Sequence, residues 1–245
     1  MLEGMYSAAS GMAAQQARID ALSNDLANVN TTGYKSVRVA FRDLLYTPAG
    51  PGANKGVASG SGAAATEIGR TIEQGAMDTT SRPLDVAIEG TGFLQVTDAQ
   101  NRTLLTRDGA LQRRADGRLM TSSGDYTGVT VPPAVADSDI HILADGTVRT
   151  NQRLYGKLKL VQVPAPDQLL AVGNNNFQLT AASGRPAPLP RGSTTAIRQD
   201  MLEGSNVDLA SVMSELIDAQ RGFEMASKAI NTQDQLYEIA NQVKR

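Results

Sequence analysis

Residues 206–245 read NVDLASVMSELIDAQRGFEMASKAINTQDQLYEIANQVKR. This stretch contains no proline, and large apolar residues recur in it every seven positions, which is the spacing of a helix that packs along a partner. The seam positions are Leu209, Leu216, Phe223, Ile230 and Tyr237. Ser205 or Asn206 is the predicted N-cap, with Asp208 in the first turn. The pattern predicts a long C-terminal helix within residues 196–245.

The start of the chain carries the same spacing between Leu2 and Val29. Its seam consists of Met5, Met12, Ile19 and Leu26, with Leu22 and Val29 three residues behind. The seam is narrow, so this helix would be marginal alone and needs a partner. We therefore predict an N-terminal helix within residues 1–35.

The region between the helices has a different pattern, with short apolar runs separated by turn residues. The runs are 84–88, 93–96, 129–131, 140–143 and 154–163. The last run predicts a single strand with Leu154, Leu158 and Leu160 on one face. Asp-Gly pairs at 108–109, 116–117 and 145–146 predict hairpin turns. Residues 81–195 are thus expected to form a β domain.

Residues 36–80 connect the first helix to this domain, and 48–65 are rich in glycine and alanine, so we expect an extended linker or arm. The predicted class is α+β, in which long coiled-coil-forming helices at both ends flank a mainly antiparallel β domain. Two helical seams around a separate β domain suggest a helical layer formed by the termini.

Composition excludes several classes of function. The 23 basic and 25 acidic side chains give a net charge of −2, so no nucleic-acid partner is predicted. No stretch reaches the roughly 18 apolar residues that a membrane span needs, so no membrane insertion is predicted. The absence of cysteine removes thiolate catalysis and cysteine-based zinc sites. His141 could share a strand face with Asp137 and Asp139, but a solvated face explains these residues better than a metal site. We predict no cofactor, no metal and no enzymatic activity.

Four blocks resemble the flagellar rod, hook and hook-junction proteins. They are 28–35 (NVNTTGYK), 84–96 (LDVAIEGTGFLQV), 106–109 with 116–119 (TRDG, DGRL) and 203–207 with 220–224 (EGSNV, QRGFE). Together they span most of the chain, which makes the resemblance more specific than one short motif. The matching motif residues include Asn28, Asn30, Thr31, Gly33, Tyr34, Lys35, Asn206, Gln220 and Arg221.

This resemblance implies a structural subunit of the flagellar basal-body rod. It implies export by the flagellar type III apparatus without a cleaved signal peptide, and a location in the periplasmic part of the basal body. The seam residues would then be the assembly interface, since terminal helices of such proteins polymerise with further copies and with related rod and hook proteins. We expect the distal rod. The alternatives are the proximal rod, another hook-basal body protein, a monomeric binding module or a wall-cleaving enzyme.

Overall fold

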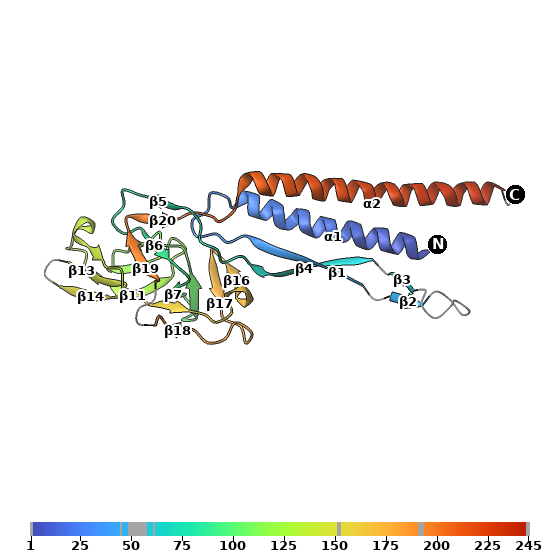
Figure 1. Ribbon diagram of the computed structural model, residues 1–245. Coiled ribbons are helices and arrows are strands. Elements are labelled where there is room, and N and C mark those ends of the chain that lie inside the picture. Colours follow the sequence, from blue (N-terminus) through green and yellow to red (C-terminus); the bar gives the residue numbers. More distant parts are fainter. Residues whose placement is uncertain are drawn as a thin grey trace. The chain divides into compact units, whose positions relative to one another are not determined.

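The computed structural model describes residues 2–44, 46–48, 58–60, 62–150, 153–190 and 194–243 (Figure 1). The chain divides into two compact units. The helical unit comprises Met1–Ala27, Val37–Ile68 and Asp208–Arg245, and the β unit comprises Asn28–Ser36 and Gly69–Val207. The chain therefore passes between the units four times, and each unit is described by itself below.

The helical unit contains α1, Leu2–Ala27, and α2, Leu209–Val243. The two helices lie side by side (Figure 1). They run antiparallel, because Gly4 lies against Gln233 near one end, whereas Arg18 pairs with Glu215 near the other. Both predicted helices are confirmed, and the overall class is α+β as expected.

Asp208 is the N-cap of α2. Its Oδ2 accepts a hydrogen bond from the Ser211 backbone N at 3.0 Å, and its carbonyl oxygen accepts one from the Val212 N at 3.0 Å. Hydrogen bonds from the hydroxyl and amide of Ser211 hold the pKa of Asp208 below its usual value. The predicted caps at Ser205 and Asn206 were wrong, since both residues are engaged before the helix begins.

An arm of paired strands completes the helical unit. Strand β1, Val37–Asp43, pairs with β4, Ala63–Arg70, and β2, Tyr46–Pro48, pairs with β3, Ala58–Gly60. The last turn of α1 is joined to β1, because the buried Asp25 carboxylate accepts hydrogen bonds from the Val37 N at 3.1 and 3.3 Å. The expected glycine-rich arm at 48–65 lies partly outside the described residues.

The β unit contains antiparallel sheets. In the described part of the chain nine strands form the largest one, in the order β16-β17-β8-β7-β11-β10-β9, with β15 on β7 and β18 on β15. Smaller sheets pair β12-β13-β14, β19-β6 and β20-β5. The strand bounds are β5 Met77–Thr79, β6 Val86–Glu89, β7 Phe93–Thr97, β8 Thr103–Thr106, β9 Gln112–Arg113, β10 Arg118–Met120, β11 Tyr126–Thr130, β12 His141–Ile142, β13 Thr147–Arg149, β14 Leu154–Lys157, β15 Leu160–Gln162, β16 Leu170–Gly173, β17 Asn176–Gln178, β18 Ala187–Pro188, β19 Ala196–Gln199 and β20 Met201–Glu203. Two 3-10 turns span Asp137–Asp139 and Pro166–Gln168.

Two of the expected local features differ in the structure. The run 154–163 is divided into β14 and β15, which belong to different sheets, so Leu154 is exposed while Leu158 is buried. The pair Asp108-Gly109 is buried and forms no hairpin, because the Asp108 carboxylate accepts a hydrogen bond from the Ala110 N at 3.0 Å. The other two Asp-Gly pairs do precede hairpin strands, with positive φ at their glycines.

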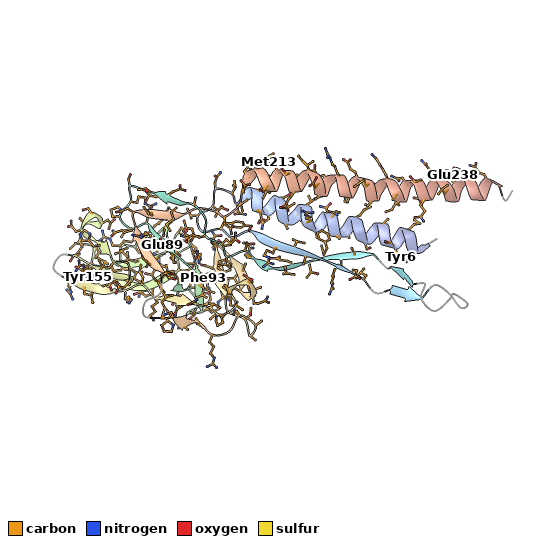
Figure 2. All side chains as sticks on the ribbon, in the orientation of Figure 1. Tyr6, Glu89, Phe93, Tyr155, Met213 and Glu238 are labelled. Atoms are coloured by element: carbon orange, nitrogen blue, oxygen red, sulfur yellow. The ribbon has the colours of Figure 1, made fainter. Side chains whose placement is uncertain are left out.

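The core of the β unit consists of two clusters of buried apolar side chains, most of which come from its strands. One cluster includes Ile88, Leu119 and Val129, and a second includes Phe93 and Phe177, whose rings meet edge to face at 6.0 Å (Figure 2 labels Phe93). The helices described here include none that is long and apolar enough to cross a membrane.

Candidate functional site

Three charged side chains from distant parts of the chain meet inside the β unit. Lys35 precedes β1, Arg107 follows β8, and Glu203 ends β20. All three are at most 1% exposed. Glu203 Oε1 lies 2.6 Å from Lys35 Nζ, and its Oε2 lies 3.2 Å from Arg107 Nη1. These residues are called the ionic junction below.

Backbone groups satisfy much of what remains of the junction's hydrogen-bonding capacity. Glu203 Oε1 also accepts a bond from the Gly75 N at 3.0 Å, and Lys35 Nζ donates to the Glu73 carbonyl at 2.6 Å. Arg107 Nη2 donates to the Gly90 carbonyl at 2.8 Å. Buried charges are tolerated when they are paired and hydrogen-bonded. Each charged group of the junction is paired, although Arg107 Nε has no hydrogen-bond partner in the part of the chain that the structure describes.

The junction contains two cations and one carboxylate, so its positive charges outnumber its negative charge. Burial lowers the pKa of Lys35 below its ordinary value of 10.5. The Glu203 carboxylate opposes this shift and Arg107 adds to it. The guanidinium of Arg107 also lies 5.2 Å from the Phe93 ring, a cation–π contact that stabilises its buried charge.

A backbone hydrogen bond also joins the segment that carries Lys35 to the segment that carries Glu203. The Gly33 N donates to the Glu203 carbonyl at 2.8 Å. Gly33 has a φ of 68°, and a Cβ there would lie 2.7 Å from the carbonyl carbon of Arg107, so only glycine fits. The segment 33–35 therefore lies directly against the junction it helps to form.

Asn206 extends this connection by four hydrogen bonds, one of which runs from its Nδ2 to the Glu73 carbonyl at 3.3 Å. Its Oδ1 accepts from the Ser36 N at 2.9 Å, its Nδ2 donates to the Thr71 carbonyl at 2.8 Å, and its backbone N donates to the Tyr34 carbonyl at 3.4 Å. Segments 33–36, 71–75 and 203–206 are thus bonded to one another. They lie next to three of the four positions at which the chain passes between the two units, namely 36–37, 68–69 and 207–208.

The remaining residues of the N-terminal motif form a turn and its supports. Asn28 accepts hydrogen bonds from the backbone N and hydroxyl of Thr31, both at 3.1 Å. Tyr34 is buried, with the Arg70 guanidinium 5.4 Å from its ring, whereas Asn30 is exposed. Helix α1 ends at Ala27, directly before this motif.

A second polar network holds Thr32. Its hydroxyl donates to Asp108 Oδ1 at 3.2 Å, and its carbonyl accepts from Asn175 Nδ2 at 2.7 Å. Ser122 also donates to the Asp108 carboxylate. Because Asn175 lies in the β16–β17 turn, the N-terminal motif is bound from both the hairpin and the Asp-Gly segment.

Sequence reasoning gave Arg107 and Glu203 no role, although both lie in blocks that carry the family resemblance. Their neighbours along the chain could have indicated a buried position for both residues. Arg107 follows the buried run Leu104–Thr106, and Glu203 follows Leu202 at the end of a strand. A charged residue beside buried positions suggests a buried partner, but the partner's identity depends on the fold.

The predicted seam residues are distributed unevenly in the helical unit. Met5, Met12, Ile19 and Leu26 on α1 are half-buried and Leu22 is buried. On α2, Leu216, Phe223 and Ile230 are half-buried, whereas Leu209 is exposed. Val29 follows α1 and is half-buried in the β unit, and the side chain of Tyr237 lies outside the described residues. Gln220 and Arg221 are exposed on α2.

The ionic junction has the properties of a structural clamp. Its charged groups are inaccessible to solvent and to any substrate, and they pair with one another. Among the described residues there is no group of three or more His, Asp or Glu side chains suited to hold a metal ion. Asp137, one of the three candidate ligands, instead pairs with Arg113 at 2.8 Å.

Three family models match the chain in order. Residues 5–35 match "Flagella basal body rod protein", residues 87–150 match "Flagellar hook protein FlgE/F/G D1 domain", and residues 198–243 match "Flagellar basal body rod FlgEFG protein C-terminal". Each member of the ionic junction lies within a different one of these matched segments, so the junction joins all three.

Full-length relatives agree with these matches. The chain is 38% identical over 267 residues to the flagellar basal-body rod protein FlgG of Borreliella burgdorferi, covering 100% of both chains. It is 35% identical to FlgG of Caulobacter vibrioides, covering 99% of this chain and 100% of that one. It is 28% identical to FlgF of Mesorhizobium japonicum, covering 91% and 90%. The chain belongs to the flagellar basal-body rod proteins and is a structural subunit of the rod, not an enzyme.

Proposed function

We propose that copies of this chain polymerise through α1 and α2 to form the distal part of the rod. The main support for this proposal is a set of apolar side chains on α2 that are exposed in the single chain. Met213, Met225, Leu236 and Ile239 are each more than half exposed, and Tyr6 on α1 is 72% exposed (Figure 2 labels Tyr6 and Met213). Apolar side chains repeated along one helix are typical of an interface.

Within one chain, α1 and α2 pair with each other, and most of the seam residues are half-buried. The helix pair, which leaves apolar side chains of α2 exposed, is therefore the element that we expect to contact other copies. Full-length similarity to proteins named FlgG supports the distal rod over the proximal rod. Related rod and hook proteins would be the neighbours at the two ends of the segment.

We further propose that the chain is exported by the flagellar type III apparatus, keeps its N-terminal segment, and acts in the periplasmic space. The support is that α1 is itself half of the proposed polymerising pair, so removal of residues 2–27 would leave α2 without its partner. The intact mass of the chain extracted from basal bodies should therefore include these residues. A chain cleaved after α1 would contradict this part of the proposal.

The main test is deletion of Leu209–Arg245 in a strain that lacks the natural chain. This cut leaves Glu203 and Asn206 in place, so the β unit should still fold, as measured by circular dichroism. Electron microscopy should show basal bodies with the proximal rod but no distal segment. Distal rods built from the truncated chain would overturn the proposal, and loss of the proximal rod as well would favour the proximal alternative.

A further inference from the structure

A hollow of about 260 Å³ lies in the helical unit, on the side of α1 that faces β1. Leu22, Val37, Val39 and the 44% exposed Phe41 form the apolar part of its lining, and Arg18 and Glu215 form a polar part. A water molecule takes up about 30 Å³ in the liquid, so the hollow is large enough for an aliphatic side chain.

The rim of this hollow is charged. Arg18 Nη2 lies 3.0 Å from Glu215 Oε2, and the Arg18 guanidinium lies 6.0 Å from the Phe41 ring. The Glu215 side chain is about half exposed, so its carboxylate remains open to a further cation. A hollow that combines these apolar side chains with an accessible carboxylate suits an apolar side chain that carries a basic neighbour.

The outer face of α2 offers such a group. Leu209, Met213 and Ile217 follow one another at intervals of four and are each about half exposed. Arg221 continues the same row and is also exposed. Residues four apart lie on one face of a helix, so these side chains form a continuous apolar row ending in a cation. They are called the outer row below.

The hollow and the outer row point away from each other. Glu215 is two positions from both Met213 and Ile217, which at 3.6 residues per turn is about 200° around the helix. One chain therefore cannot place its own outer row in its own hollow. A second copy can do so while leaving its own hollow free for a third.

We propose that the outer row of one copy docks into the hollow of the next, with Ile217 against Leu22 and Val39 and with Arg221 beside Glu215. The inference rests on the proposed function, since it names the contact through which the helix pairs polymerise. Two different surfaces on opposite sides make the contact head-to-tail, which generates an open series of copies. The charges agree with this docking, because the exposed Arg221 guanidinium would meet the half-exposed Glu215 carboxylate.

The test uses the absence of cysteine from the chain. The double variant Val39→Cys, Ile217→Cys is assembled into basal bodies, oxidised mildly and analysed by denaturing electrophoresis. Head-to-tail docking should give a ladder of covalent dimers, trimers and longer species, since each copy supplies one thiol to each neighbour. A contact between identical surfaces would stop at dimers, and that result would overturn the proposal.

The matched control is Val39→Cys, Met225→Cys. Met225 is 67% exposed but lies eight positions from Ile217, about 12 Å farther along the helix axis, so it is too far from Val39 of the neighbour and should give no ladder. Intact rods with no ladder from the first variant would show that the docking is wrong while polymerisation through the helices stands. Rods built without α2 would instead contradict the proposed function itself.

A photoreactive benzoylphenylalanine at Phe41 gives a second measurement if the cysteine variant builds no rods. It replaces one aromatic side chain by a larger one at a half-exposed position beside the hollow. Mass spectrometry should find crosslinks to residues 209–221 of another copy. Crosslinks confined to other segments would overturn the proposal.

Discussion

Lys35 Nζ and Glu203 Oε1 lie 2.6 Å apart in the interior of the β unit, although 168 positions separate the two residues in the chain. The contact closes the β unit around its two ends. Arg107, near the middle of the sequence, shares the same carboxylate. The stability of the unit should therefore depend on a few buried charges as well as on its apolar core.

Replacing Glu203 by glutamine should destabilise the β unit by about 3–5 kcal/mol, because it leaves two buried cations without a counter-charge. Urea unfolding followed by circular dichroism would measure the change. Glu89→Gln is the control, since Glu89 pairs with Arg198 on the surface and its loss should cost under about 1 kcal/mol. Equal effects of the two substitutions would contradict the role assigned to Glu203.

Replacing Lys35 by methionine should cost less than Glu203→Gln. Glu203 would keep Arg107 and the Gly75 amide, and the cost of burying the ammonium would disappear. The same urea experiment compares the two variants directly. A larger loss for Lys35→Met would mean that the Lys35 ammonium, and not the carboxylate, is the central group.

The lowered pKa of Lys35 predicts a dependence on alkaline pH. The folded protein releases this proton before the unfolded chain does, so below pH 10.5 there is a window in which the unfolded chain binds more protons and stability rises with pH. The free energy of unfolding of the natural protein should thus gain on that of Lys35→Met as the pH approaches 10.5. Lys159→Met, at an exposed position, controls for the loss of one lysine, and a flat or falling difference would contradict the shift.

Gly33→Ala should destabilise the protein by more than about 2 kcal/mol. The added Cβ meets backbone of Arg107 and Asp108 within 2.8 Å, and the positive φ disfavours any L side chain. Thermal unfolding would detect the loss. Gly11→Ala on α1 is the matched control: a Cβ there meets nothing within 4 Å, and alanine should stabilise the helix by up to about 1 kcal/mol.

A fragment of residues 28–207 should fold cooperatively, whereas residues 81–195 should not. The shorter fragment lacks Lys35, Ile197 and Glu203, so strand β6 loses its partner β19 and Arg107 becomes a buried cation without a carboxylate. Thermal melts and dispersion of amide resonances would distinguish the two. Cooperative unfolding of 81–195 would show that the junction is dispensable for the sheets.

The sequence was sufficient for the two helices because their evidence is local. Apolar positions repeated at sevens predicted elements that the structure places at Leu2–Ala27 and Leu209–Val243. The cap of α2 was misplaced by a few residues, since Ser205, Asn206 and Asp208 all have suitable side chains. Only the contact of Asn206 with Ser36 shows why it does not serve as the cap.

The strands were predicted less well, because their ends depend on neighbours far along the chain. The run 154–163 reads as one strand, yet the ladder between β13 and β14 shifts register between Leu154 and Gly156, and β14 ends at Lys157 while β15 joins a different sheet. The Leu158 N then donates to the Gly146 carbonyl. The ionic junction is a stronger case, since no local pattern links Lys35 to a glutamate 168 positions later.

The separation of Lys35 and Glu203 along the chain also sets a minimum time before the β unit can complete its fold during synthesis. Synthesis at about 5–20 residues per second separates the appearance of the two residues by roughly 8 to 34 s. Throughout that interval Lys35 lacks its partner Glu203. Strands β5 and β6 likewise lack their pairing strands β20 and β19, which have not yet been synthesised. A nascent chain thus remains open for most of its production, and it acquires its lasting shape only when nearly all of it has been made.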